Sequence, residues 1–201
     1  MLSPEFHQAM APKTKILNLI WGAFTVACVV YVAVAWYILE QSGSSAAAMG
    51  QSEQPDPMLG MVFKVVAFSM LLASIAAERL LLAPSKLAAL LKSAPEAATV
   101  FATNQVSPTS PSAEQARLFE SLPEAEQRLA GLGGVYQTSR IVVWALREGV
   151  VVLGLVLAIM ESSFPVILPF AAVGFITMLI KVPRPVSFYE SQLDAARKYI
   201  Q

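Results

Sequence analysis

The sequence predicts an all-α integral membrane protein, with four transmembrane helices arranged as two hairpins, a cytoplasmic loop helix and a C-terminal amphipathic helix. Three observations lead to this fold class. Of the 201 residues, 56% are hydrophobic and only 14% are charged, whereas soluble domains carry roughly 25% charged residues. The hydrophobic residues are gathered into four long runs. Most lysines and arginines flank these runs on one side only.

The first predicted hairpin consists of two apolar runs, residues 16–39 and 58–82. The first run has no charged side chain and is long enough to cross a hydrocarbon core of roughly 30 Å. A cleaved signal peptide is the alternative, because residues 46–48 (Ala-Ala-Ala) resemble a cleavage site, but the apolar core of a signal peptide spans only about 7–15 residues. The second run ends before Pro84, since proline does not continue a helix comfortably.

The segment between the hairpins, residues 85–139, is the one substantial stretch outside the predicted spans. Residues 85–92 form a basic, amphipathic continuation of the second helix that is suited to lie on lipid headgroups. Residues 103–113 are rich in serine, threonine and proline and read as a linker. The segment is too short and too polar to build an independent core. We therefore expect one membrane domain over residues 1–201.

A soluble helix is expected within this segment, from Ala113 to Ala130. It is interrupted or restarted at Pro123, and Ser121 followed by Glu124 fits a capping box. The glycines that we expect to end this helix are Gly131, Gly133 and Gly134.

The second predicted hairpin consists of residues 140–160 and 165–181, joined by a very short loop. The tail, residues 183–201, follows the last span. Within it, apolar residues recur at helical spacing: Tyr189, Leu193, Ala196 and Ile200. The tail is thus predicted to be an amphipathic helix that lies on the membrane surface or on the loop helix.

The flanking charges predict the orientation. The basic residues beside the runs are Lys13, Lys15, Lys86, Lys92, Arg140, Lys181, Arg184, Arg197 and Lys198. They lie before the first run, between the second and third runs, and after the fourth, whereas the other two loops hold only acidic residues. By the positive-inside rule both termini and the long segment are cytoplasmic, which in a bacterial cell makes this a multi-pass inner-membrane protein.

Four charged residues fall inside the predicted spans. Glu78 and Arg79 lie roughly 6–9 Å from the cytoplasmic end of the second span, at 1.5 Å per residue. Arg147 and Glu148 lie roughly 10–12 Å into the third. Charges at such depth usually have partners. The sequence therefore predicts that Glu78 pairs with Arg147 and Arg79 with Glu148, in a cluster that is either structural or ion-coupling.

Small residues at four-residue spacing indicate where the spans pack closely. They are Ala73 and Ala77 in the second span, and Ala145, Gly149, Gly154 and Ala158 in the third.

The sequence ALREG at 145–149, followed by LGLV at 153–156, resembles the carboxylate-bearing helix of rotary-ATPase proteolipid (c/K-type) subunits. Glu148, Gly154 and Leu155 match the pattern of that helix. The resemblance implies that Glu148 is the intramembrane carboxylate of a proton- or ion-translocating protein. The chain departs from the family at Arg147, which adjoins the acid.

The whole chain also looks like small four-span bacterial membrane proteins, which share the Ile20-Trp21 opening and the Val-Pro-Arg sequence at 182–184. This resemblance supplies a fold and no activity.

The sequence favours a structural function over catalysis. Ser69, Ser74 and Thr177 lie in the spans without a visible base beside them, so we expect no enzyme activity and no catalytic residue. With one histidine, His7, and one cysteine, Cys28, we expect neither a metal nor another cofactor. The zero net charge argues against nucleic acid as a partner.

The expected function is therefore that of a small accessory subunit or adaptor that packs in the bilayer against other membrane proteins or itself. The alternative is translocation of protons or ions through Glu148.

Overall fold

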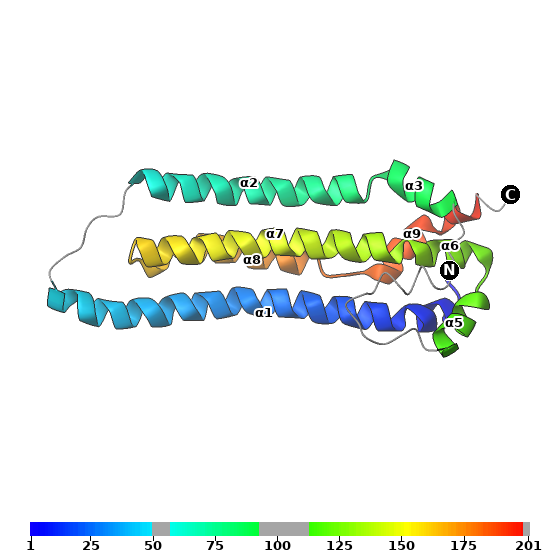
Figure 1. The fold of residues 1–201 in the computed structure, drawn as a ribbon, viewed down its shortest axis with the longest axis horizontal. Coiled ribbons are helices and arrows are strands. Elements are labelled where there is room, and N and C mark those ends of the chain that lie inside the picture. Colours follow the sequence, from blue (N-terminus) through cyan, green and yellow to red (C-terminus); the bar gives the residue numbers. More distant parts are fainter. Residues whose placement is uncertain (50–56, 93–112, 199–201) are drawn as a thin grey trace. The chain divides into compact units, whose positions relative to one another are not determined.

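The computed structural model describes residues 1–49, 57–92 and 113–198. The described residues are helical and contain no strand, which confirms the all-α class (Figure 1). Apart from Ala113, the predicted linker over 103–113 lies outside the described residues, and so does Ile200 of the tail.

Four long helical segments coincide with the four apolar runs. Their bounds are α1 Pro4–Met49, α2 Pro57–Leu81, α7 Gly133–Met160, and the pair η1 Phe164–Val166 and α8 Ile167–Ile180. Two of them begin earlier than the hydrophobic runs suggest. The first helix begins at Pro4, before the apolar run that starts at residue 16. Gly133 and Gly134 begin α7 instead of ending the helix before it.

Within the described residues, three helices are long and apolar enough to cross a membrane, and up to four if residues 164–180 and 185–197 count as one broken span. This arrangement is compatible with a membrane protein. By itself α8 is too short to be counted as a span. It has only 14 residues, which gives about 21 Å of helix, whereas the hydrocarbon core is roughly 30 Å thick.

The chain divides into two compact units, which are described separately. Unit 1 comprises Met1–Leu19, Glu78–Arg140 and Pro183–Gln201, and unit 2 comprises Ile20–Ala77 and Ile141–Val182. The boundaries fall within α1, α2 and α7, so each of these helices contributes residues to both units.

Unit 1 has an apolar core that residues far apart in the sequence build together. Besides the ends of the long helices it contains α3 Pro84–Lys92, α5 Ala113–Glu120, α6 Glu124–Gly131 and α9 Pro185–Arg197. Its buried residues are Leu2, Phe6, Ala9, Met10, Leu87, Leu91, Phe119, Leu122, Ala125, Leu129, Ala130, Leu132, Tyr189, Leu193 and Ala196. The segment between the hairpins therefore shares its core with both ends of the chain.

The tail helix α9 packs against α6 and α3. This confirms the second of the two predicted positions for the tail, on the loop helix. The side chains of Tyr189, Leu193 and Ala196 are buried there, so the helical spacing seen in the sequence does mark the contact face.

The predicted capping box is wrong. The N-cap of α6 is Pro123, with no side-chain hydrogen bond, and Ser121 lies too early to reach the first turn. The Ser121 hydroxyl instead donates to the carbonyl oxygen of Leu118, 2.8 Å away, at the end of α5.

A different serine forms a cap, at the start of α1. The Ser3 hydroxyl oxygen accepts a hydrogen bond from the backbone N–H of Phe6 at 3.1 Å, as an N-cap does. Its own hydroxyl and backbone N–H donate to the two carboxylate oxygens of Glu126, which is buried in α6. The first residues of the chain are thereby attached to α6.

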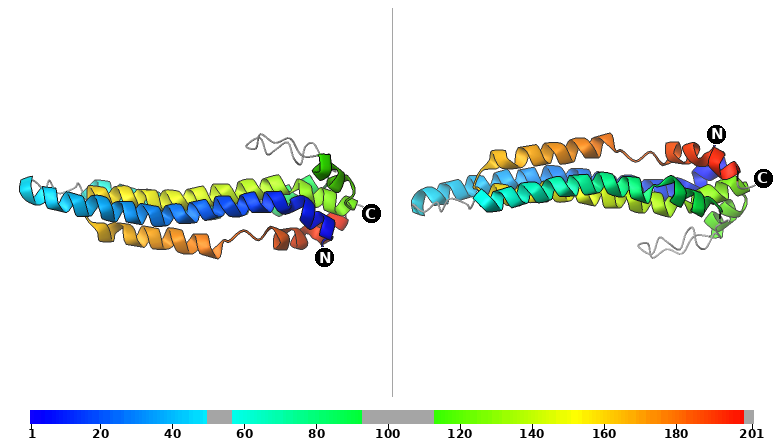
Figure 2. Two further views of the ribbon diagram at one scale, coloured as in Figure 1. Left: turned by 90° about the horizontal axis from the view of Figure 1, so that it is seen from below. Right: turned by 90° about the horizontal axis from the view of Figure 1, so that it is seen from above.

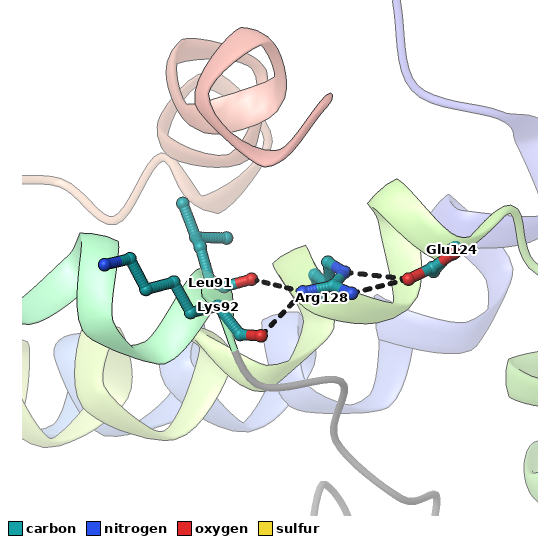
Figure 3. A network of polar contacts seen from close by, with 4 residues as sticks. All are labelled: Leu91, Lys92, Glu124 and Arg128. Atoms are coloured by element: carbon teal, nitrogen blue, oxygen red, sulfur yellow. Dashed lines mark hydrogen bonds and ion pairs between the residues drawn. The ribbon is translucent and has the colours of Figure 1, made fainter. Parts of the chain in front are cut away.

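Arg128 of α6 holds the last turn of α3 (Figure 3). Its Nη1 donates to the carbonyl oxygens of Leu91 at 2.9 Å and Lys92 at 2.8 Å. These are among the last carbonyls of α3, which have no partner within their own helix. Its Nε and Nη2 donate to Oε1 of Glu124, one turn earlier, which orients the guanidinium.

Replacing Arg128 with lysine is therefore expected to free the end of α3. Lysine keeps the charge but lacks the fork that binds both carbonyls and Glu124 together, so the loss should be about 1–2 kcal/mol. Hydrogen exchange in residues 84–92 of the purified protein measures it. Arg197→Lys is the matched control, because Arg197 is exposed and its partner in α9 is Asp194, at 3.6 Å. Equal exchange in both variants would contradict this role for Arg128.

Unit 2 is a bundle in which α7 contacts the three other helices, and the helices run lengthwise along one another in all three views (Figures 1 and 2). One buried cluster joins α1, α7 and the start of α8 through residues that include Cys28, Val151 and Ile167. Glycines allow α7 its closest contacts: Gly149 lies against Met70 of α2, and Gly154 against Phe170 of α8.

Candidate intramembrane polar site

Glu148 on α7 is bound by a tyrosine of α1. The Tyr31 hydroxyl donates to Glu148 Oε1 at 2.8 Å. Cys28 is buried one turn before Tyr31 on the same helix. The predicted intramembrane carboxylate thus lies within unit 2 and has a hydroxyl partner that sequence reasoning missed. The sequence does contain a sign of this partner, because Tyr31 is a polar side chain in the middle of an apolar run that has no charged residue.

Arg147 points to a different helix from its neighbour Glu148. It is 4% exposed, and its Nη1 donates to the carbonyl oxygen of Thr177 on α8 at 2.8 Å. The Trp21 indole N–H donates to the next carbonyl, that of Met178, at 3.2 Å. Both carbonyls belong to the last turn of α8, and the Met178 carbonyl also accepts the backbone N–H of Lys181 at 3.2 Å. Arg147 and Trp21 therefore both donate to carbonyls at the end of a short apolar helix, where a buried carbonyl without a partner would be costly.

Glu78 forms an ion pair in unit 1 with Arg140. Arg140 Nη1 lies 2.8 Å from Glu78 Oε1, and both side chains are less than a fifth exposed. The Arg140 guanidinium also lies 5.1 Å from the centre of the Tyr136 ring. From the sequence, Arg140 was assigned only to the flank of the third span.

The predicted Glu78–Arg147 and Arg79–Glu148 pairs would each join unit 1 to unit 2, and they stay predictions. Arg79 is exposed.

The six small residues expected at helix contacts lie in different surroundings. Gly149 and Gly154 are in close contact with side chains of α2 and α8, and Ala158 is fully buried. Ala77 is half-buried, whereas Ala73 and Ala145 are exposed. The sequence analysis missed Gly174 of α8, which lies against Val151 of α7.

Lys13, which from the sequence only flanks the first span, is buried in unit 1 with 7% exposure. Burial lowers the pKa of its ammonium group from 10.5 to about 8. The residues that line the pocket around it include Tyr136 and Tyr189.

The buried Lys13 predicts a stability that rises with pH. Because its folded-state pKa is lowered, the unfolded chain binds more protons between pH 8 and 10.5, so the stability contributed by Lys13 increases across that window. The shift corresponds to about 3 kcal/mol. Unfolding of the detergent-solubilised protein and of Lys13→Met, measured from pH 7 to 10.5, should give curves that converge towards high pH. A constant difference would contradict the prediction.

Among the described residues, no group of three or more histidine, cysteine, aspartate or glutamate side chains is placed to hold a metal ion. Comparison of the chain with protein-family models, with curated proteins and with solved structures finds no match.

Proposed function

We propose that this protein is a small inner-membrane accessory subunit or adaptor, without catalytic activity of its own. In this proposal four spans form two hairpins, and both termini and residues 85–139 are cytoplasmic. Unit 2 packs in the bilayer against lipid and other membrane proteins, and unit 1 is a cytoplasmic contact module.

The observation that supports this proposal best is the construction of unit 1. Three separate segments of the chain converge on one apolar core. The contact of Ser3 with Glu126 ties the first segment to the second, and the contact of Arg128 with α3 joins two helices of the second segment. Such a folded unit presents a defined surface, unlike a mobile loop. Its exposed side chains on α9 include Glu190, Asp194 and Arg197.

Purification of the tagged full-length chain from native membranes in mild detergent tests the adaptor proposal. We expect a partner membrane protein at fixed stoichiometry. A large homo-oligomeric ring would favour the alternative below, and a chain without any stoichiometric partner would contradict the proposal.

Site-directed labelling tests the topology. Because Cys28 is the only cysteine, single cysteines are introduced into Cys28→Ala at exposed positions, as Glu120→Cys and Gln41→Cys. We expect a membrane-impermeant maleimide to label Gln41→Cys in intact cells and Glu120→Cys only after the inner membrane is opened. The reverse pattern would overturn the orientation.

The second candidate function is proteolipid-like proton or ion translocation through Glu148. Two contacts favour it. Tyr31 binds the carboxylate from α1, and the Arg147 guanidinium reaches the end of α8, although it adjoins Glu148 in the sequence. A carboxylate bound by a neutral hydroxyl, on a helix that resembles the carboxylate-bearing helix of proteolipid subunits, is a candidate ion-binding group.

Carbodiimide labelling separates the two functions, since the reagent attacks protonated carboxyl groups. In the adaptor, we expect Glu148 to resist labelling and Tyr31→Phe to increase it, because the substitution removes the hydroxyl that is bonded to the carboxylate oxygen. In a translocator, wild-type Glu148 is labelled increasingly as the pH falls. Glu148→Gln reports the background, and Glu40→Gln, which changes an exposed acid, is the control.

A further inference from the structure

Basic residues mark every place where the chain enters or leaves unit 1. These boundaries lie between residues 19 and 20, 77 and 78, 140 and 141, and 182 and 183. Lys15, Arg79, Arg140 and Arg184 each belong to unit 1 and lie within about one helical turn of one boundary. The edge of unit 1 at which the apolar runs begin and end is therefore rich in positive charge.

The structure separates three of these basic residues from the fourth. Lys15, Arg79 and Arg184 are exposed, and none of them takes part in an ion pair of the described residues. Arg140 is bound to Glu78, which is the one acidic residue within a turn of any boundary. The exposed charge beside the boundaries is thus positive only, and we call Lys15, Arg79 and Arg184 the basic collar.

Each residue of the basic collar is followed within four positions by an exposed apolar side chain, which also belongs to unit 1. These apolar neighbours are Leu19, 73% exposed, Leu80, 65% exposed, and Val186, 41% exposed. A single exposed leucine needs no explanation. Here, however, a cation and an apolar side chain recur together at three separate places, which suits a partner that carries an anionic group next to an apolar chain.

The exposed acidic residues of unit 1 lie farther from the boundaries. Among the side chains that the structure describes they are Glu5, Glu120, Glu124, Glu190 and Asp194. The nearest of them along the chain is Glu190, seven residues beyond Pro183. Exposed basic residues also occur in this part of unit 1, where the charge is therefore mixed. An anionic partner is consequently attracted to the basic collar more strongly than to the rest of unit 1.

We propose that the basic collar binds the headgroups of anionic phospholipids, while its apolar neighbours contact the first part of the acyl chains. An acidic protein surface would match the cations but would not need an apolar side chain beside each of them. The placement of these lipids in the inner leaflet rests on the topology proposed above. The pairing of cations with apolar side chains does not depend on it.

Fluorescence quenching in reconstituted bilayers tests the lipid preference. The full-length protein is placed in mixtures of phosphatidylglycerol and phosphatidylcholine with the same acyl chains, and one lipid at a time carries brominated chains. Trp36→Phe removes an exposed tryptophan elsewhere on α1, so that Trp21, two residues after Leu19 and partly exposed, becomes the reporter. Trp144 is fully buried and contributes a constant background. Native mass spectrometry counts the phosphatidylglycerol that the protein retains.

Two triple variants remove the same amount of charge from different places. Lys15→Gln/Arg79→Gln/Arg184→Gln removes the basic collar. The matched control changes three exposed basic residues that lie farther from the boundaries, as Lys92→Gln/Arg117→Gln/Lys198→Gln. Circular dichroism checks that both variants are folded.

We expect phosphatidylglycerol to associate about fivefold more strongly than phosphatidylcholine at low salt, because one basic residue near an anionic lipid surface contributes about that factor. The preference should disappear in the collar variant and persist in the control variant. It should also disappear in about 1 M salt, where the screening length falls to about 3 Å.

Equal association of the two lipids with the unmodified collar, or a preference that the collar variant retains, would overturn the proposal. If the triple variant folds poorly, Lys15→Gln decides, because it changes one exposed side chain close to Trp21 along the chain. Equal lipid association, together with a co-purifying protein that the collar variant loses, would assign the collar to an acidic protein surface instead.

The lipid experiment and the topology experiment fail separately, because phosphatidylglycerol is present in both leaflets of the reconstituted bilayer. A lipid preference together with reversed maleimide labelling would overturn the proposed orientation alone. The expected labelling without a lipid preference would overturn only the role of the basic collar.

Discussion

Replacing Gly174 of α8 with alanine is expected to lower the free energy of unfolding by about 1–3 kcal/mol, because the contact between α7 and α8 has no room for a methyl group. A Cβ at this position would overlap Cγ2 of Val151, and it would lie 3.5 Å from the carbonyl oxygen of Arg147. Val151 is fully buried and branched at Cβ, so it has few ways to move aside. The helices must separate, which also disturbs the bond from Arg147 to Thr177.

Gly22→Ala is the matched control for this experiment. Gly22 lies in the middle of α1, and a Cβ there would have nothing within 4 Å. Alanine is the better helix former by up to about 1 kcal/mol, so the same substitution should leave stability unchanged or raise it. Unfolding in mixed micelles with increasing denaturing detergent, followed by circular dichroism, measures both variants. Losses of similar size would show that α7 and α8 are not in this close contact.

Replacing Arg140 with glutamine is expected to cost about 3 kcal/mol or more. The substitution leaves Glu78 without the guanidinium that lies 2.8 Å away, in a place where its side chain is 18% exposed. Removing one member of a buried ion pair destabilises strongly because the remaining charge stays desolvated. The double variant Glu78→Gln/Arg140→Gln should be less destabilised than Arg140→Gln, since it leaves no unpaired carboxylate at position 78. Thermal unfolding in detergent measures all of these variants.

Arg79→Gln is the control, because Arg79 follows Glu78 directly and is exposed. Arg79 is not part of the Glu78–Arg140 ion pair, so its effect should be smaller, within about 0.5 kcal/mol as for substitutions away from buried contacts. If Arg79→Gln instead costs as much as Arg140→Gln, the Arg79–Glu148 pair predicted from the sequence gains support. Losses from Arg79→Gln and Glu148→Gln that simply add would contradict that pair.

The long helices could be predicted from the sequence because an apolar run is a local property with a length set by the bilayer. The residues at which these helices begin and end could not be predicted in this way. Gly133 looks like a helix terminator, yet it begins α7, where its lack of a side chain leaves room for Tyr189 and Met10 of other helices. Ser121 has the sequence of a capping box, but the cap of α1 by Ser3 is the one that forms.

The candidate site was predicted in part. The charged residues within the spans stand out in the sequence, because charges are rare in apolar runs. The partners of these charged residues do not stand out in the sequence. Two of the partners are a tyrosine hydroxyl and a backbone carbonyl, and neither group is charged. The burial of Lys13 could not be predicted from the sequence, since a lysine before a span is normally interpreted as a topology signal.

By itself the sequence determined that this chain is helical, that its apolar runs suit a membrane, and which charged residues lie within them. These properties follow from composition and spacing along one segment at a time. Only the tertiary structure decided that both termini join the central segment in one core, that Arg140 binds Glu78, and that Tyr31 binds Glu148. Each of these contacts depends on how helices distant in sequence pack, and many packings satisfy the same hydrophobic pattern.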